Sequence, residues 1–431
     1  MSKVIGYLYT TEKRAMLALV LIALLSKTLV AFYVLYNYGT ARWDDDHYYL
    51  YVGEQIASGN WSPEWNARTE IIVGPVLPLL IAFFKLVFGN PVVPFFFYNI
   101  VMGSLMVPVL YFLGREVFSR RVGWIMALWG LLYIEAFKYL PHLAKESTLF
   151  LFLPLTILLV IRSAGTGKLF RLTVLAALSY SWLIHSDERF IIYLPLLVGL
   201  FFIYNKSGNS PNATIKSLIW VGVVILTMIP WTVHNYRVHD QLVILTPRTT
   251  AFTSKLWGEN LEKAASHFTD SNVRDAIIES RRERAEGFGM DHGKKPYEYG
   301  LWEARFKAFQ HFWQPTYFRL HFIQYGFRTE MWSLRHNAAS IIFYGIFLPF
   351  YLAGLALLIR RKAWPALLIS LIPIIHSIMH AYMVWPLERY RSPITFIIVM
   401  VGVWAFLNFL VWCRLGGRDD NPFAIYEKGQ H

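Results

Sequence analysis

Residues 13–49 read KRAMLALVLIALLSKTLVAFYVLYNYGTARWDDDHYY, and this stretch decides the fold. Lys13 and Arg14 precede an apolar run, Ala15 to Tyr36, that is long enough to cross about 30 Å of hydrocarbon as a helix. Basic residues prefer the cytoplasmic flank of a span. The run therefore predicts a helix that starts in the cytoplasm and delivers Trp43 and the acidic residues behind it to the outer face.

The composition places the rest of the chain in the membrane as well. Of 431 residues, 55% are hydrophobic and 16% are charged, whereas soluble domains carry about 25% charged residues. The net charge is +13, but most basic residues outside one long loop flank apolar runs. That placement indicates membrane topology and argues against nucleic-acid binding. The single cysteine, Cys413, excludes an intramolecular disulfide and a cysteine-based metal site.

The apolar runs predict an all-α polytopic membrane protein with about ten transmembrane helices. Counted this way, every inner turn is basic, as the cytoplasmic preference of Lys and Arg requires. The stretch 73–88 contains prolines and a lysine, and it would reverse this pattern if it crossed. We therefore interpret it as re-entrant or interfacial. The predicted spans are 15–36, 94–113, 122–140, 147–161, 172–184, 190–204, 217–230, 338–359, 363–383 and 392–413.

This topology divides the chain into four parts, with both termini in the cytoplasm. The expected parts are an N-terminal transmembrane module (1–230) with its first outer loop at about 37–93, an outer region (231–337), C-terminal transmembrane helices (338–413) and a tail (414–431). The outer region contains a helical pattern, Val273 to Ala285. It then continues with an aromatic pattern of interfacial type: Trp302, Phe306, Phe309, Phe312 and Trp313.

Three adjacent carboxylates, Asp44, Asp45 and Asp46, follow the first span. They repel one another, so a fold keeps them together for solvation, for a cation or for a reaction. Their position among aromatic residues at a membrane surface favours a general base for an acceptor hydroxyl or amine. A divalent cation, Mg²⁺ or Mn²⁺, could instead bind at Asp44 and Asp46. Spacing alone does not decide between the two roles, and no other cofactor is predicted.

Basic residues on the same face supply the complementary charge. They are Arg237, Arg248 and Lys255 after the seventh span, and Arg389 and Arg391 before the tenth. Such residues could bind a phosphate and stabilise its charge as it leaves, although anchoring of helix ends is an equal alternative. Lys27 lies about 20 Å into the membrane, from where its ammonium can extend outward.

Three further polar groups admit simpler interpretations. Glu135 and Lys138 are three residues apart and are expected to neutralise each other. His376 and His380 have a spacing that suits a metal, but without a third ligand we expect packing or hydrogen bonding. The turn from His185 to Arg189 is highly charged for a short connection, and it is interpreted as lining the same cavity as the acidic cluster.

Three groups of residues, in order, resemble the motifs of the C-type (GT-C) membrane glycosyltransferases, such as aminoarabinose transferases and dolichyl-phosphate-mannose-protein mannosyltransferases. The first is Asp44 to Tyr49, followed by a short helix at Val52 to Gly59 and by Gly74 to Leu80; the second is Pro230 to Tyr236, followed by Leu242 to Thr246 and Leu256 to Asn260; the third is Arg389 to Pro393. Two positions depart from the pattern: His234 where many relatives carry Arg, and Gly74 where some carry Lys.

The resemblance implies a GT-C fold with extracytoplasmic juxtamembrane helices and one long outer loop. It implies an inverting glycosyltransferase that uses a polyprenyl-phosphate-sugar donor, with Asp44, Asp45 or Asp46 as catalytic residue. The implied phosphate-binding residues are Arg237, Arg248, Lys255, Arg389, Arg391 and Lys27. The implied cavity contains His47, Tyr48, Glu70, Lys145, Glu146, Asp187, His234 and Asn235.

The expected partners are the donor, a lipid, glycan or protein acceptor, and membrane lipids, with no nucleic acid. The expected location is a bacterial or archaeal inner membrane, with the active site outside. The main alternative is a membrane transporter or lipid-linked sugar flippase. Such a protein is expected to place ionisable groups near the midplane and often to show repeated halves, and this sequence shows neither clearly.

Overall fold

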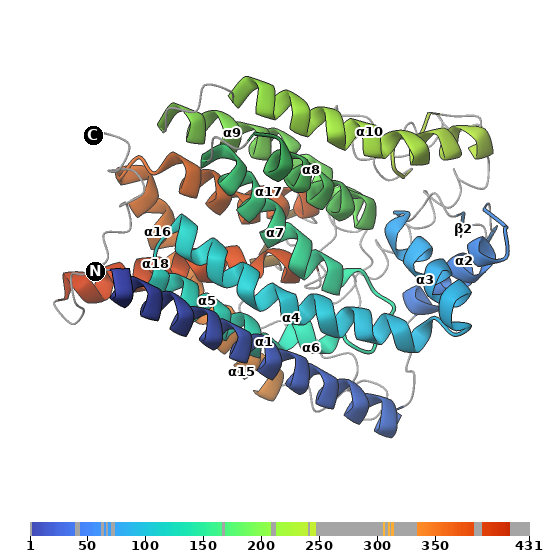
Figure 1. Ribbon diagram of the computed structural model, residues 1–431, viewed down its shortest axis with the longest axis horizontal. Coiled ribbons are helices and arrows are strands. Elements are labelled where there is room, and N and C mark those ends of the chain that lie inside the picture. The colour runs from blue at the N-terminus through green and yellow to red at the C-terminus, as the bar shows by residue number, and fades with distance from the viewer. Residues whose placement is uncertain are drawn as a thin grey trace.

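In a computed structural model, the chain forms a bundle of helices (Figure 1). The structure describes residues 2–38, 44–61, 64–65, 68–69, 74–165, 169–207, 213–239, 242–246, 305–306, 309–310, 312–313, 334–382 and 390–413. Within these ranges the only β structure is one antiparallel pair of two-residue strands, β1 (Glu64–Trp65) and β2 (Arg68–Thr69). The prediction of an all-α polytopic protein is confirmed.

Six helices in the described ranges are long and apolar enough to cross a membrane. They lie within α1 (Ser2–Tyr38), α4 (Val92–Val117), α7 (Glu146–Gly165), α10 (Ala213–His239), α17 (Trp364–Tyr382) and α18 (Thr395–Trp412), the last preceded by the 3₁₀ turn η8 (Ser392–Ile394). Other helices occupy the remaining predicted spans: α5 (Arg120–Leu132), α8 (Leu169–Ser186), α9 (Leu194–Ser207) and α16 (Leu348–Arg360). Each predicted crossing therefore contains a helix, and the number ten stays a prediction.

Four predicted spans are not continuous α-helices, and one of them is 392–413, which begins with η8. The run 122–140 breaks at Tyr133, whose ψ of 107° is extended, into α5 and α6 (Ile134–Lys138). The run 338–359 is divided among α15 (Leu334–Phe343), η6 (Gly345–Phe347) and α16, and α9 is preceded by η2 (Glu188–Tyr193). At the first break, the Tyr133 hydroxyl donates to the carbonyl of Ser392 at 3.0 Å and its ring stacks on Trp129 at 4.2 Å. These tertiary contacts override the apolar pattern.

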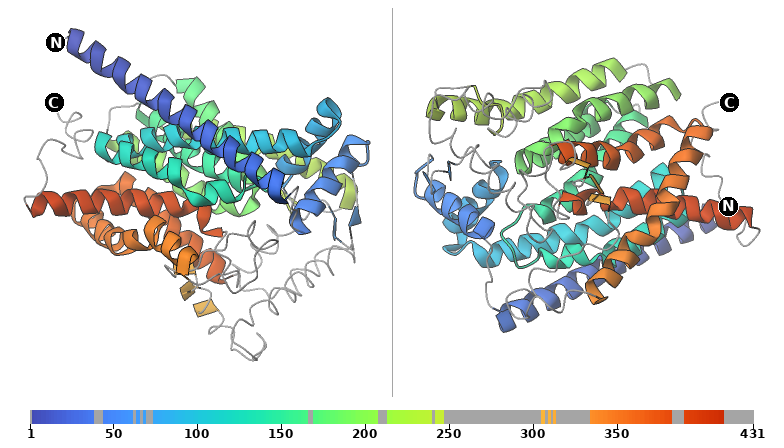
Figure 2. Two further views of the ribbon diagram at one scale, coloured as in Figure 1. Left: turned by 90° about the horizontal axis from the view of Figure 1, so that it is seen from below. Right: turned by 180° about the vertical axis from the view of Figure 1, so that it is seen from behind.

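The main helices alternate in direction along the bundle (Figures 1 and 2). The start of α1 and the end of α18 share one end. The helices α2 (Asp44–Ala57) and α3 (Val76–Phe88) lie at the other, which we call the α2 end. Packing inside the bundle is close: a Cβ added to Gly354 of α16 would lie 2.6 Å from Cγ1 of Val401 in α18. Small residues allow such approach between membrane helices.

Helix α3 is too short to cross a membrane, as predicted for this stretch. Its 13 residues extend about 20 Å at 1.5 Å per residue, against about 30 Å of hydrocarbon. One side, with Leu77 and Ile81, is buried, whereas Phe83 and Leu86 are exposed. Its Lys85 pairs with Glu54 of α2 at 3.0 Å.

The acidic residues 44–46 form the first turn of α2 and not a loop. One continuous helix therefore includes both these residues and the short helix expected from residue 52. Unpaired backbone N–H groups give a helix N-terminus a partial positive charge, which stabilises adjacent carboxylates. This explains how three such residues can lie side by side.

In the outer region, Phe312 differs from the interfacial aromatic residue that the sequence predicts. Its ring is 1% exposed, belongs to the main hydrophobic core and stacks on His380 at 6.1 Å. Phe306, in contrast, is exposed. The expected helix at 273–285 and Trp302 lie outside the described ranges. Residues 312 and 313 thus fix one point of the outer region inside the bundle.

Candidate functional site

A buried carboxylate and a buried imidazole meet at the α2 end. Oδ2 of Asp46, in the first turn of α2, lies 2.8 Å from Nδ1 of His142, and both side chains are at most 1% exposed. His142 lies in the connection between α6 and α7. Asn99 of α4 fixes this connection, because its Nδ2 donates to the carbonyls of Tyr139, Leu140 and His142, the last at 2.8 Å. Asp46 is thus held at a rigid point.

A second buried carboxylate, Asp187, lies between two cations. Its Oδ1 accepts from Nε of Arg189 at 2.7 Å, its Oδ2 accepts from the same guanidinium, and Nζ of Lys145 lies 3.0 Å from Oδ2. Burial would raise the pKa of Asp187, but the positive charges of Arg189 and Lys145 outweigh it and hold that pKa well below its ordinary value. Asp187 is therefore ionised. Lys145, at 14% exposure, is the most accessible member of the cluster.

The two clusters are neighbours through the chain. His142 and Lys145 belong to the same connection and are three residues apart. Their Cα atoms are therefore separated by at most about 10 Å. Figure 1 shows the start of α7 and the end of α8 at the same end of the bundle as α2 and α3. The predicted residues Asp46, Lys145, Glu146 and Asp187 are thus brought to one region.

Glycine at position 74 is one of the two departures from the family pattern, and the geometry around it explains why no side chain is present there. A Cβ added there would lie 2.1 Å from the carbonyl oxygen of His185, near the end of α8. No side chain fits at that distance, so a Lys at this position would force the backbones apart. Glycine permits the chain before α3 to lie directly on the end of α8.

The second departure, His234, lies in a segment that folds back on itself at the end of α10. Nε1 of Trp231 donates to the carbonyl of Leu245 at 2.9 Å. Nδ2 of Asn235 donates to the carbonyls of Val243 and Leu245, both at 3.1 Å. The His234 ring stacks on Trp231 at 4.6 Å and meets Trp61, which follows α2, edge-on at 6.3 Å. Asn235 thereby holds 242–246 against α10, and His234 connects α10 to the α2 region.

The motif that opens the last span is held by aromatic contacts. The Arg189 guanidinium lies 3.9 Å from the ring centre of Tyr390, and the His380 ring is stacked 4.8 Å from the same ring. Nε2 of His376 donates to the carbonyl of Tyr390 at 2.8 Å and lies 3.0 Å from Nε2 of His380. The expectation that these two histidines serve packing and hydrogen bonding is confirmed.

Arg391 is already engaged in the structure. It is 4% exposed, its Nη1 donates to the carbonyl of Phe312 at 2.8 Å, and its guanidinium lies 3.9 Å from the Tyr344 ring centre. It therefore links the start of the last span to residue 312. A role in binding phosphate stays a prediction for this residue.

Lys27 is enclosed deep in the bundle. It is fully buried, with its Nζ 4.4 Å from the ring centre of Phe137. A Cβ on Gly103 would lie 3.0 Å from its Cε, so the glycine makes room for the side chain. Nearby, Glu135 and Lys138 form the expected pair at 3.5 Å. The predicted phosphate contact of Lys27 stays a prediction.

The remaining predicted residues are spread more widely. Tyr48 is buried against Val52 and Ile56, whereas His47 and Arg237 are exposed. Outside the described part of the chain lie Glu70, Arg248, Lys255, Arg389 and the side chains of Asp44 and Asp45. Among described residues, no three His, Cys, Asp or Glu side chains are arranged to hold a metal. Because Asp44 is not among them, a cation at Asp44 and Asp46 stays a prediction.

His142 was not named as a site residue from the sequence, and Arg189 was named only within the charged turn from His185 to Arg189. His142 lies two residues after a predicted span and begins a polar outer turn, which is a weak signal for a functional residue. Arg189 ends the charged turn that was expected to line the cavity. Nothing in the spacing pairs residue 46 with a residue 96 positions later.

Solved structures with a similar fold come from the archaeon Archaeoglobus fulgidus. Its oligosaccharyltransferase AglB, in complex with an inhibitory peptide and a dolichol-phosphate, superposes with a TM-score of 0.56 at 15% identity over 95% of this chain and 53% of that one. The oligosaccharyltransferase tethered to an acceptor peptide superposes with a TM-score of 0.52 at 15% identity, over 96% of this chain and 53% of that one. Its complex with Zn and sulfate superposes with a TM-score of 0.52 at 14% identity, over 91% of this chain and 50% of that one. The chain spans about half the length of these structures.

The fold is therefore that of the C-type membrane glycosyltransferases, as the sequence resemblance implied. Within the chain, residues 73–234 match the family model of the dolichyl-phosphate-mannose-protein mannosyltransferases. That segment contains α3 to α9, the Asp187 cluster and His142. The comparison with curated proteins found no match.

Proposed function

We propose that this protein is an inverting glycosyltransferase that moves a sugar from a polyprenyl-phosphate-linked donor to an acceptor hydroxyl or amine at the extracytoplasmic membrane face. The observation that carries the proposal is the buried Asp46–His142 pair beside the Lys145–Asp187–Arg189 cluster, in a chain of this fold. The family match of residues 73–234 and the dolichol-phosphate bound by a structural neighbour support this class of donor.

Asp46 is the proposed general base. Its carboxylate accepts the proton of the acceptor while the acceptor oxygen or nitrogen bonds to the anomeric carbon. The bond from that carbon to the phosphate oxygen breaks, and polyprenyl phosphate leaves on the opposite side, so the configuration inverts. His142 donates to Oδ2 and fixes the orientation of the carboxylate, which contributes to catalysis because correct orientation lowers the barrier. Asp44 and Asp45 are the alternatives for this role.

Lys145 is the proposed contact for the leaving phosphate. It is partly exposed, three residues from His142, and it uses one of three N–H donors on Asp187. Arg391 is less suited, because it is 4% exposed, its Nη1 donates to the carbonyl of Phe312 and its flat face lies over the Tyr344 ring. A cation at the departing phosphate stabilises the charge that develops there.

The distribution of basic residues supports the proposed orientation. Arg115, Arg120, Arg121 and Arg162 lie at the end of the bundle opposite to α2, near the start of α1. Because Lys and Arg are retained on the cytoplasmic side, this end is the cytoplasmic one, and the α2 end faces outward.

The test is a transfer assay on the purified full-length protein. Radiolabelled polyprenyl-phosphate sugars are incubated with the protein and a membrane extract, and label is followed into lipid, glycan and protein fractions. Wild-type protein is expected to transfer label with inversion. Asp46→Asn is expected to lower the rate about 10²-fold or more, because an amide cannot accept the proton yet can keep the contact with His142.

A matched control lies in the same helix. Glu54→Gln removes a carboxylate of α2 that pairs with Lys85 and is 39% exposed, so its rate should stay within about twofold of wild type. The proposal is wrong if no donor is used, or if Asp44→Asn, Asp45→Asn and Asp46→Asn all keep full activity.

A further inference from the structure

We propose that Arg189 is a positioning residue that holds Lys145 at the leaving phosphate through Asp187. This inference rests on the proposed function and deepens it, since it concerns how the phosphate side of the same site is built. Arg189 itself is 10% exposed and does not contact the donor in this scheme.

The first support is the geometry of the carboxylate. Arg189 donates to both oxygens of Asp187, from Nε to Oδ1 and from its terminal nitrogen to Oδ2. A planar guanidinium that binds both oxygens fixes the plane of the carboxylate, which a single ammonium cannot do. Oδ2 is also the atom that lies 3.0 Å from Nζ of Lys145. Arg189 therefore decides where the contact point for Lys145 lies.

The second support is the contact with the last span. The guanidinium lies 3.9 Å from the ring centre of Tyr390, whose ring is also stacked on His380. Tyr390 is thus in contact with Arg189 and with His380, and its carbonyl accepts from His376. Arg189 cannot turn away from Asp187 without losing this stacking. The position of Asp187 is consequently tied to a second, rigid part of the bundle.

The opposite charges of Asp187 and Arg189 keep both side chains ionised. Burial would lower the pKa of Arg189, but the carboxylate of Asp187, assisted by Glu188, raises it above its ordinary value. Asp187 is ionised for the complementary reason. Lys145 is the most exposed member of the cluster, at 14%, and its two other N–H groups can bind a phosphate oxygen.

The consequence is specific to the phosphate side. Without the Arg189 side chain, Asp187 keeps the bond from the backbone N–H of residue 189 to Oδ1 at 3.2 Å, but Oδ2, which contacts Lys145, is no longer held by the guanidinium, so the affinity for polyprenyl phosphate falls. The Asp46–His142 pair is fixed separately, by Asn99. The pH dependence that belongs to the base should therefore be unchanged.

The test compares Arg189→Ala and Arg189→Lys with wild type, using purified full-length protein. Arg189→Ala should lower kcat/KM for the labelled donor about 10²-fold, a loss typical of a misplaced catalytic contact. Guanidinium at tens of millimolar should raise the kcat/KM of Arg189→Ala at least about tenfold, because it can occupy the vacated space between Asp187 and Tyr390. Arg189→Lys, which keeps the charge but not the planar fork, should stay at least about tenfold impaired.

Arg162→Ala is the matched control. Arg162 also binds one carboxylate through two nitrogens, at Glu116, but at the opposite end of the bundle. The Arg162→Ala variant should keep its kcat/KM for the donor within about twofold of wild type, and guanidinium should affect it only as it affects wild type. If Arg189→Ala or Arg189→Lys matches wild type, or if folded Arg189→Ala is impaired without guanidinium rescue, the inference is overturned.

A binding measurement separates this inference from the proposed function. Unlabelled polyprenyl phosphate is titrated against wild type, Asp46→Asn and Arg189→Lys in detergent. Asp46→Asn should bind like wild type, whereas Arg189→Lys should bind at least about tenfold more weakly. If this pattern holds while wild type transfers no sugar, the proposed function fails and the role of Arg189 stands. If wild type transfers sugar and Arg189→Lys binds equally well, only the inference fails.

Discussion

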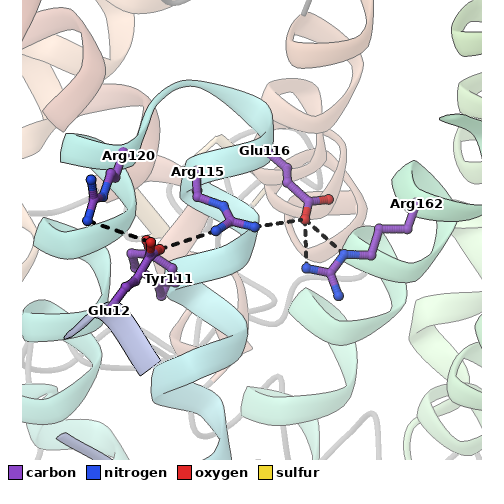
Figure 3. A network of polar contacts seen from close by, with 6 residues as sticks. All are labelled: Glu12, Tyr111, Arg115, Glu116, Arg120 and Arg162. Carbon is purple, nitrogen blue, oxygen red and sulfur yellow. Dashed lines mark hydrogen bonds and ion pairs between the residues drawn. The ribbon is translucent and has the colours of Figure 1, made fainter. Parts of the chain in front are cut away.

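Both ends of the bundle contain ion pairs, but of these two ends only the α2 end has buried ones among the described residues, beside the exposed pair of Lys85 and Glu54. At the end opposite to α2, Glu12 lies 3.2 Å from Arg115 and 3.6 Å from Arg120, and Glu116 lies 2.6 Å from Arg162 (Figure 3). These side chains are 18–49% exposed. At the α2 end, Asp46 and Asp187 are at most 1% exposed. Exposed pairs keep most of their hydration, whereas buried carboxylates have lost it.

This difference indicates two purposes for charge. Lys and Arg residues beside membrane spans commonly serve topology, a role that any sufficient number of them can fill. At the α2 end, carboxylates lie in buried positions where apolar residues would avoid the free-energy cost of desolvation. Their presence there indicates a chemical role. Perturbed, buried charges in one region are typical of active sites. The following changes test whether burial is the distinction that matters.

The largest effect is expected for Asp187→Asn. It leaves Arg189 and Lys145 without their shared carboxylate in a buried position, which costs about 3–5 kcal/mol of the free energy of unfolding. Unfolding of both proteins in detergent, by heat or denaturant, measures the difference. A difference below about 1 kcal/mol would contradict the buried-cluster interpretation.

The same pair of proteins gives a pH test. The pKa of Asp187 is held below its ordinary value by the charges of Arg189 and Lys145, which outweigh burial. A lowered carboxyl pKa stabilises the folded state above the ordinary value of about 3.9 and loses this contribution as pH falls below it. The stability difference between wild type and Asp187→Asn should therefore be constant from about pH 8 to pH 6 and shrink below about pH 4.

A smaller loss is expected for Gly74→Ala. The added Cβ would lie 2.1 Å from the His185 carbonyl, a backbone atom, so α3 or α8 must shift, which costs about 1–3 kcal/mol. The control is Gly222→Ala in α10, where nothing lies within 4 Å of the added Cβ. That change should be neutral or stabilising by up to about 1 kcal/mol. Equal stability of both variants would mean that α3 and α8 do not touch at Gly74.

The sequence could predict the fold class and the motif order for a physical reason. Apolar length and the position of basic residues are local properties, and they put a helix in every predicted span, although α1 begins 13 residues before its predicted start and α10 ends nine residues after its predicted end. The breaks at Tyr133 and in 344–347 could not be predicted, because they follow from distant contacts such as the hydrogen bond from Tyr133 to Ser392. An apolar run of spanning length looks the same whether or not such a contact interrupts it.

The site was predictable only in part, for a similar reason. Asp46, Lys145 and Asp187 belong to charged turns at predicted span ends, so topology alone brings them to one face. The partners His142 and Arg189 depend on how α2, α7 and η2 pack, and no local pattern contains that information. Gly74 departs from the family motif, and only the close approach to His185 explains why a side chain is excluded there.

The smallest effect is expected for Glu116→Gln at the end opposite to α2. Glu116 accepts from Nε and Nη2 of Arg162 at 2.8 and 2.6 Å, yet its side chain is 20% exposed and Arg162 is 35% exposed. The loss should be about 0.5 kcal/mol, and it should diminish at 1 M salt, where the screening length is about 3 Å. The loss in Asp187→Asn should change little with salt, because solvent ions do not enter a buried cluster. Unfolding of both variants at low and high salt checks this. A salt-insensitive loss of several kcal/mol in Glu116→Gln would show that the two ends do not differ through burial, since an Arg donates from two nitrogens at both, to one oxygen of Glu116 and to both oxygens of Asp187.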